Sequence, residues 1–183
     1  MTIDEAQTDM RHAYFSGAAG IFASSLAWLT AALVAHLASP RGGIATLFLG
    51  GMLIHPVAMM LSKILGRPGA HARDNPLGRL AIETTVWMLL AIPLAFLLSF
   101  QRVEWFFVAM LIVIAGRYFT FATLYGLRIY WLLGAALACA AFGLLALNAN
   151  STIAALAGGV IELMFAGIVF STARRDATTV AAS

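Results

Sequence analysis

The sequence predicts an all-α, polytopic membrane protein built as a bundle of six transmembrane helices. Hydrophobic residues fill 62% of its 183 positions and charged residues only 10%, whereas a soluble domain carries about 25% charged residues. A hydrocarbon core needs roughly 20 apolar residues per helix, so six spans would use about 120 residues and leave only short connections. We therefore expect a single transmembrane domain over residues 1–183.

Six apolar runs are long enough to form these helices, and clusters of Pro, Gly, Asn and Ser separate most of them. The predicted helices cover about residues 14–38, 42–65, 77–100, 103–124, 129–147 and 152–172. Only residues 125–128 separate the fourth helix from the fifth, and a turn is needed there because the two together exceed one bilayer crossing. Asn75 and Pro76 predict the start of the third helix, as N-cap and first helical residue.

The distribution of basic residues predicts that both termini are cytoplasmic, because Lys and Arg near helix ends are retained on that side. With the N-terminus inside, Arg41 and Arg102 are the basic residues that fall outside. Residues 1–10 are acidic, unlike the start of a secretory signal, so we expect the first helix to be retained. The basic residues are spread over helix ends, which argues against nucleic-acid binding.

The longest connection, residues 66–76, has basic residues within and beside it that could contact membrane lipids. Each could contribute about 1 kcal/mol of attraction to anionic headgroups. The candidates are Lys63, Arg67, Arg73 and Arg79. Retention of positive charge on the cytoplasmic side explains the same residues without specific lipid binding.

Alanines recur every four residues in the first predicted helix and form a smooth stripe. The stripe consists of Ala19, Ala23, Ala27, Ala31 and Ala35. Helices in lipid associate through close packing of small residues. The stripe therefore predicts either a packing seam within the chain or a docking surface for a second copy or another membrane subunit.

Ionisable residues inside the spans are the strongest indication of function, because a charge near the bilayer centre costs roughly 2.5 to 3.5 kcal/mol. Counted from the inner helix ends, Glu83 and Arg117 lie about 10 Å deep, His55 roughly 14 Å and Glu162 roughly 16 Å. We expect these four residues to line a pathway for a substrate or an ion. Glu83 and Arg117 could instead form a buried structural ion pair.

The sequence gives no indication of a cofactor, a metal site or a catalytic residue. The histidines are expected at different depths, which does not suit paired haem ligands, and no spacing of Cys and His resembles a zinc site. The serines lack a histidine and a carboxylate at a compatible depth. An intramembrane enzyme is therefore the least favoured class.

Two segments, Ile54-His55-Pro56 through Leu61-Ser62-Lys63 and then Asn75-Pro76-Leu77-Gly78, carry a Ser-Lys…Asn-Pro-Leu-Gly motif. This pattern resembles a small family of uncharacterised bacterial multi-pass membrane proteins. The resemblance implies a location in the bacterial inner membrane and a compact helical bundle. It implies no activity and no functional residue.

Three functions fit these observations. The first is a small transporter or channel-like protein for a small polar or anionic solute, with proton coupling as an option. The second is a substrate-binding membrane subunit that docks on a partner through the alanine stripe, similar in size and helix number to the substrate-capturing subunits of energy-coupling-factor vitamin transporters. The third is a structural membrane protein without a ligand, which would have no continuous polar cavity.

Overall fold

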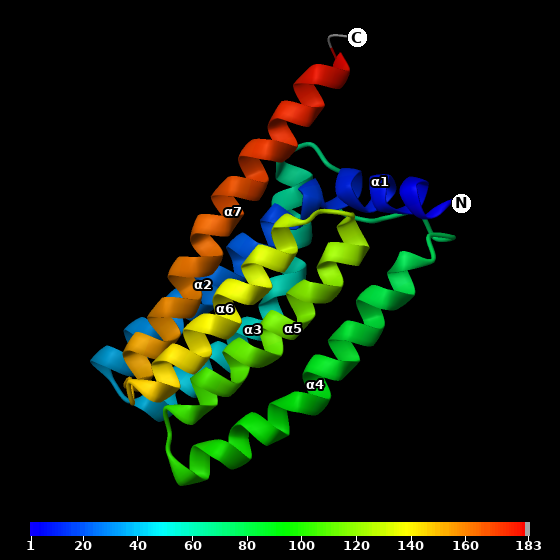
Figure 1. The fold of residues 1–183 in the computed structure, drawn as a ribbon. Helices are drawn as coiled ribbons and strands as arrows, with labels where there is room; N and C mark the ends of the chain where they lie inside the picture. Colours follow the sequence, from blue (N-terminus) through cyan, green and yellow to red (C-terminus); the bar gives the residue numbers. More distant parts are fainter. Residues whose placement is uncertain (182–183) are drawn as a thin grey trace.

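The computed structural model describes residues 1–181, with side chains as far as Arg175, and this part of the chain is all-α. Its elements are α1 (Ile3–Tyr14), a short 3-10 turn η1 (Phe15–Gly17), α2 (Ala18–Leu37), α3 (Pro40–Ile64), α4 (Leu77–Gln101), α5 (Trp105–Tyr125), α6 (Ile129–Ala146) and α7 (Ser151–Ala181). Figure 1 shows α2 to α7 as a bundle, with α1 lying across one end, and the C-terminal part of α7 extends past this end. We refer to this end as the α1 end.

Six helical segments of the described chain are long and apolar enough to cross a membrane, and each contains one of the helices α2 to α7. This confirms the predicted all-α class and the predicted number of long apolar helices. The composition and length of these segments indicate a multi-pass membrane protein. The largest difference in bounds is at α7, which continues past the expected end at residue 172 to Ala181.

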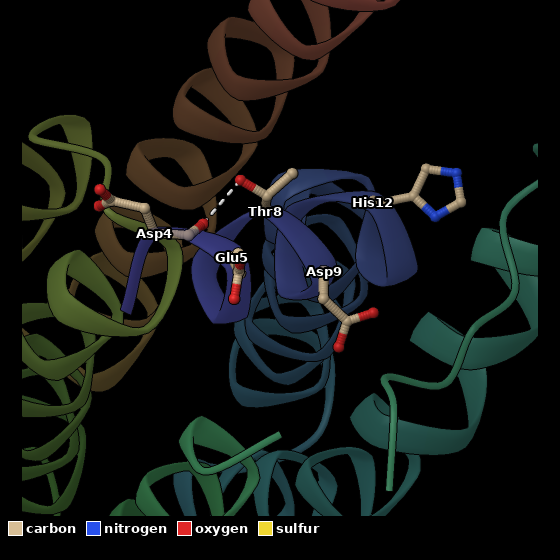
Figure 2. Close-up of a pocket in the computed structure, with 5 residues that line it drawn as sticks. All are labelled: Asp4, Glu5, Thr8, Asp9 and His12. Carbon is tan, nitrogen blue, oxygen red and sulfur yellow. Dashed lines mark hydrogen bonds between the residues drawn. The ribbon is translucent and has the colours of Figure 1, made fainter. Parts of the chain in front are cut away.

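Helix α1 was not expected as a separate element, because the sequence predicted a first helix starting at residue 14. The new helix begins with a capping box, in which the Thr2 hydroxyl accepts from the Glu5 amide and the Glu5 carboxylate accepts from the Thr2 amide. Further along, Thr8 donates to the carbonyl of Asp4, and Asp9 and His12 project away from the helix axis (Figure 2). The face of α1 that packs on the bundle is buried through Ala6, Met10 and Ala13.

The break between α1 and α2 is a turn of left-handed residues. Phe15, Ser16 and Gly17 have φ values of 54°, 55° and 87°, a region that non-glycine residues rarely adopt. A Cβ at Gly17 would collide with the hydroxyl of Tyr130 and the ring of Tyr125. Glycine is therefore needed at position 17 both for the backbone conformation and for the close approach of these tyrosines.

Asn75 ties the beginning of α4 to α1. Its Oδ1 accepts from the Leu77 amide at 2.9 Å, as a capping residue would, although α4 begins at Leu77, one residue later than predicted, and Pro76 precedes it. Its Nδ2 donates to the Ala6 carbonyl at 3.0 Å and to Asp9 Oδ2 at 2.7 Å. The same Asp9 oxygen accepts from the Ala72 amide at 2.9 Å. The connection between α3 and α4 thus holds α1 across the end of the bundle.

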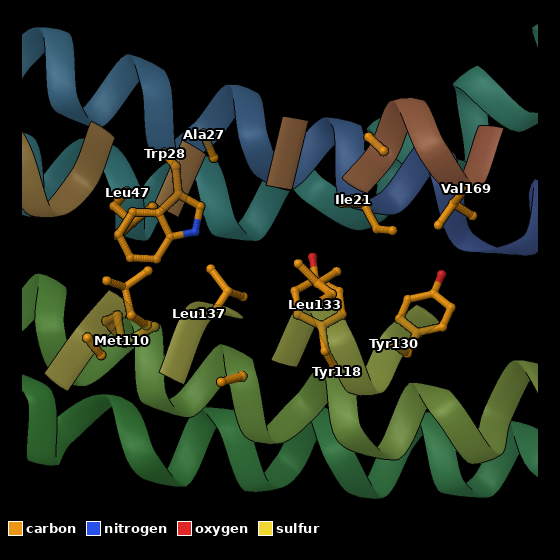
Figure 3. Close-up of a cluster of buried hydrophobic side chains, with 14 of the residues drawn as sticks. Ile21, Ala27, Trp28, Leu47, Met110, Tyr118, Tyr130, Leu133, Leu137 and Val169 are labelled. Carbon is orange, nitrogen blue, oxygen red and sulfur yellow. The ribbon is translucent and has the colours of Figure 1, made fainter. Parts of the chain in front are cut away.

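The six long helices form two layers. Helix α2 packs on α3 and α7, which we call the α2 layer, and α5 packs on α4 and α6, which we call the α5 layer. Figure 3 shows the two layers as separate rows with large buried side chains between them. Those that Figure 3 labels include Trp28, Met110, Tyr118, Tyr130, Leu133 and Leu137. The space between the layers is therefore filled mainly by aromatic and large aliphatic groups.

Candidate functional site

Glu162 lies between the two layers and is fully buried. It belongs to α7, and its Oε1 accepts a hydrogen bond of 2.9 Å from the hydroxyl of Tyr118 on α5. Its other oxygen, Oε2, is buried and has no hydrogen-bond partner among the described residues. Burying a carboxyl group with so few donors is costly. Most buried polar atoms have a hydrogen-bond partner, and Oε2 of Glu162 is an exception.

Residues of α2 form the other side of this site. Ser24 is buried close to the Glu162 carboxyl. One turn further along α2, Trp28 is 1% exposed, and its indole Nε1 has no hydrogen-bond partner among the described residues. Gly158, one turn before Glu162, allows this approach, because a Cβ there would lie 3.0 Å from Cδ2 of Trp28.

A row of tyrosines leads from Glu162 towards the α1 end. The ring of Tyr118 stacks on that of Tyr130, with centroids 6.0 Å apart, and Tyr130 stacks on Tyr125 at 5.3 Å. The Tyr130 hydroxyl donates to the carbonyl of Ser16 at 2.6 Å. Figure 3 shows the hydroxyls of Tyr118 and Tyr130 directed towards the α2 layer. The row therefore connects the buried carboxyl with the left-handed turn beneath α1.

Arg117 faces α4 rather than Glu162. Its Nη2 donates to the Thr85 hydroxyl and its Nη1 to the sulfur of Met88, both at 3.2 Å. The guanidinium lies 5.3 Å from the ring centroid of Phe121. Its Nε is buried and has no hydrogen-bond partner within the described part of the chain. Arg117 and Glu162 do not form an ion pair.

The structure does not bring Glu83 and His55 to this site. Both side chains are exposed on the bundle surface. The structural ion pair considered for Glu83 and Arg117 is not formed, because Arg117 contacts Thr85 instead. Two residues along a helix correspond to a rotation of roughly 200°, so a helix that turns Thr85 towards α5 turns Glu83 away from it.

The alanine stripe lies inside the chain. All five residues are buried, with exposed fractions of 0 to 8%. A Cβ at Gly43 of α3 would lie 2.7 Å from Cβ of Ala35, and one at Gly50 would lie 3.0 Å from Cβ of Ala27. The stripe thus faces the glycines of α3, which is the packing seam that small residues allow between helices. In this structure it presents no surface to a partner.

The basic residues near the long connection lie at the α1 end. Lys63, Arg73 and Arg79 are exposed. Arg67 is half-buried, with its guanidinium 5.0 Å from the ring centroid of Phe15. Their contact with lipid headgroups stays a prediction. The three exposed side chains are better placed to reach headgroups than the half-buried Arg67.

Two shallow surface hollows do not reach Glu162. One, of about 580 Å³, is lined by Asp4, Glu5, Thr8, Asp9 and His12 on α1 (Figure 2). Several of its polar groups are already used by the capping box and by the bond from Asn75. The other, of about 610 Å³, is apolar and lies where Phe48 faces α4 around Pro93. Glu162 is therefore closed off from both hollows in this conformation.

Sequence reasoning missed Tyr118, Trp28 and Ser24. The signal for Trp28 was its position in the middle of an apolar helix, since tryptophans of membrane proteins concentrate near the lipid headgroups. Tyr118 follows Arg117 directly, but the two point to different neighbours because adjacent residues are about 100° apart on a helix. No spacing rule pairs Tyr118 with a residue on α7.

The profile of a family of unknown function (DUF7010) matches residues 3–172 of the chain. No curated protein and no solved structure matches it. The match agrees with the resemblance to an uncharacterised family. The Ser-Lys…Asn-Pro-Leu-Gly motif as a family feature and the bacterial origin stay predictions.

Proposed function

Because this chain belongs to the DUF7010 family, whose function is unknown, we propose a function from its geometry: a small transporter that moves a polar or anionic solute together with a proton. Glu162 is the group that binds the proton in this proposal. The solute passes between the α2 layer and the α5 layer. Tyr118 and Trp28 contact it from the two sides.

The observation that carries the proposal is the incomplete hydrogen bonding of Glu162 between the layers. The carboxyl receives one hydrogen bond from Tyr118, and its Oε2 has no partner among the described residues. A carboxylate accepts at both oxygens, whereas a protonated carboxyl needs fewer donors and can donate itself. Gain and loss of a proton therefore change how well this site is satisfied, which suits a coupling group better than a structural one.

The layered architecture supports a pathway at the same place. Glu162 belongs to one layer and its donor Tyr118 to the other. Separation of the layers would break this bond and open the carboxyl to a solute. Transporters of this general kind bind their substrates near the middle of the membrane, between bundles that move against each other.

Proton flux in reconstituted vesicles tests the proposal. Vesicles contain a pH-sensitive dye, and chloride, pyruvate or glycine is supplied outside at matched osmolarity. We expect at least one of these solutes to acidify the lumen with the wild type. Glu162→Gln should lower that flux at least 10-fold, because an amide cannot carry the proton.

Glu83→Gln is the matched control, since it makes the same substitution on an exposed position of α4. It should retain the wild-type flux. The proposal fails if none of the three solutes acidifies wild-type vesicles, or if Glu162→Gln supports the same flux as the wild type.

We further propose that the protein lies in a bacterial inner membrane with both termini in the cytoplasm. Lys63, Arg67, Arg73 and Arg79 belong to the α1 end, where α7 also ends, whereas Arg41 and Arg102 lie at the opposite end. This imbalance favours a cytoplasmic α1 end.

Reporter fusions in a bacterial host check this topology. A green fluorescent protein fused to the C-terminus should fluoresce, whereas alkaline phosphatase at the same position should be inactive. Phosphatase fused after Ser39, between α2 and α3, should be active and serves as the control. Active phosphatase at the C-terminus would reverse the orientation.

A further inference from the structure

The two layers are joined differently at the two ends of the bundle. At the end opposite α1, the chain passes from α6 to α7 through residues 147–150 alone, and Arg102 Nη1 donates to Asn148 Oδ1 at 2.7 Å. At the α1 end, the connection from α3 to α4 is much longer and covers residues 65–76. Because an extended chain spans about 3.3 to 3.6 Å per residue, the long connection allows the layers to part at the α1 end, whereas the short one holds them together at the other.

Helix α1 lies over this looser end and binds the α5 layer. It is continuous with α2 and so belongs to the α2 layer in the chain. Gln7 Nε2 donates to the carbonyl of Thr123, and Arg11 Nη1 donates to the carbonyl of Tyr125, both at 2.7 Å. These carbonyls belong to the last turn of α5, where a helix has no donors of its own for them. Two side chains of α1 therefore join the layers where the chain itself leaves them loose.

Helix α1 also binds the long connection. The amide of Gly69 donates to the carbonyl of Ala13 at 3.0 Å, and the hydroxyl of Tyr14 lies 2.9 Å from Nδ1 of His71. Asp9 accepts two further hydrogen bonds from the same connection. The connection cannot extend while these bonds are formed. Release of α1 would free it to follow a separation of the layers.

The attachment of α1 is mainly polar. Its buried residues are Ala6, Met10 and Ala13, which offer little apolar surface. The hydrogen bonds lie at the end of the bundle, where water can replace them. The turn that links α1 to α2 holds Phe15 and Ser16 in a left-handed conformation that non-glycine residues rarely adopt. Segments with few buried apolar contacts open more readily than the core of a protein.

We infer that α1 is a clasp, which closes the two layers at the α1 end and opens about the turn Phe15–Gly17 as a hinge. Opening breaks the bonds of Gln7 and Arg11 to α5, and α1 leaves the α5 layer together with the connection that it binds. The layers then part on the side of the tyrosine row that leads to Glu162. The clasp is a property of the fold. Its control of solute entry rests on the proposed function.

Thiol labelling tests the clasp. Ser24→Cys in a Cys139→Ala background places a thiol at a buried position beside Glu162. A water-soluble maleimide can reach this thiol only when the layers part. Gln7→Ala together with Arg11→Gln should raise the labelling rate at least 10-fold, because both hydrogen bonds to α5 are lost.

Two controls separate opening of the clasp from a general loss of structure. His12→Gln changes an exposed residue of α1 and should leave the labelling rate unchanged. Ala154→Cys places the thiol at a buried position near the opposite end of the bundle and should stay unreactive in every variant. The inference is overturned if loss of Gln7 and Arg11 leaves the labelling of Ser24→Cys unchanged, or if both reporter thiols gain reactivity equally.

A cross-link separates the clasp from the proposed function. Gln7→Cys and Thr123→Cys, in the Cys139→Ala background, are joined by a short bis-methanethiosulfonate reagent. The cross-link should lower the vesicle flux of chloride, pyruvate or glycine at least 10-fold, and a reductant should restore it. Flux that the cross-link leaves unchanged would overturn the clasp as a gate and leave the transporter. Labelling that follows the clasp, with no flux in vesicles, would support the clasp and overturn the transporter.

Discussion

Replacing Gly158 with valine is expected to push α2 away from α7 and to lower the melting temperature of the detergent-purified protein by roughly 4 to 8 °C. A Cβ at this position would lie 2.8 Å from Cδ2 of Leu111 and 3.0 Å from Cδ2 of Trp28. Both neighbours are buried and have little room to move. Overpacking of this kind costs about 2 kcal/mol.

The same helix offers a matched control. A Cβ at Gly167 would meet nothing within 4 Å. Gly167→Val should therefore keep the wild-type melting temperature within about 2 °C, since it changes helix propensity by only a few tenths of a kcal/mol. Thermal unfolding followed by tryptophan fluorescence measures both variants. Equal melting temperatures for Gly158→Val and Gly167→Val would show that the contact of α2 with α7 at Trp28 is not tight.

Measuring the proton flux of the Gly158→Val variant in vesicles tests whether the contact of α2 with α7 affects the site around Glu162. Glu162 lies one turn beyond Gly158, and Ser24 lies one turn before Trp28, so a shift of α2 displaces the groups around the carboxyl. We expect the variant to lose flux at temperatures where it is still folded, whereas Gly167→Val should retain it.

The number and order of the long apolar helices could be predicted from the sequence, because they depend on local properties of the chain. An apolar run of about 20 residues has few alternatives to a membrane-crossing helix. Asn75 before Pro76 is a capping pattern whose hydrogen bond forms within two residues, and it is present at 2.9 Å. Such features need no knowledge of the rest of the fold.

The left-handed turn between α1 and α2 could not be predicted from the sequence, because it depends on residues far away in the chain. Phe15 and Ser16 carry no sequence signal for a left-handed backbone. Their conformation is held by Tyr130, which donates to the Ser16 carbonyl and lies 114 positions further along the chain. Only the folded bundle brings these groups together.

The candidate site was predicted from the positions of ionisable residues along their helices, without the directions of their side chains. Counting from helix ends selected Arg117, which the structure buries partly, and Glu162, which it buries fully. The count gives no angle around the helix axis, so it also included Glu83 and His55, which the structure leaves exposed. The partners of a buried charge depend on that angle, which is why Tyr118 was missed.

Removing the Tyr118 hydroxyl is the second large effect we expect. Tyr118→Phe leaves the fully buried Glu162 carboxyl without its donor, and an unsatisfied buried group of this kind costs about 1 to 3 kcal/mol. In a Glu162→Leu background the same change should cost little, because no carboxyl is left to satisfy and the hydroxyl itself has lost its acceptor. Equilibrium unfolding of the wild type, both single variants and the double variant measures the coupling, expected at about 1 to 3 kcal/mol.

The sign of this coupling bears on how the two layers are held together. The Tyr118 to Glu162 bond joins the α5 layer to the α2 layer in a region otherwise filled by apolar and aromatic side chains. If the bond stabilises the closed arrangement, Tyr118→Phe should also speed hydrogen exchange of the α7 amides around Glu162, and Glu162→Leu should suppress that increase. Additive stability changes, with no difference in exchange between the two backgrounds, would mean that apolar packing alone closes the layers. The protonation of Glu162 would then have no link to the separation of the layers, and the coupling of proton to solute would have no structural basis.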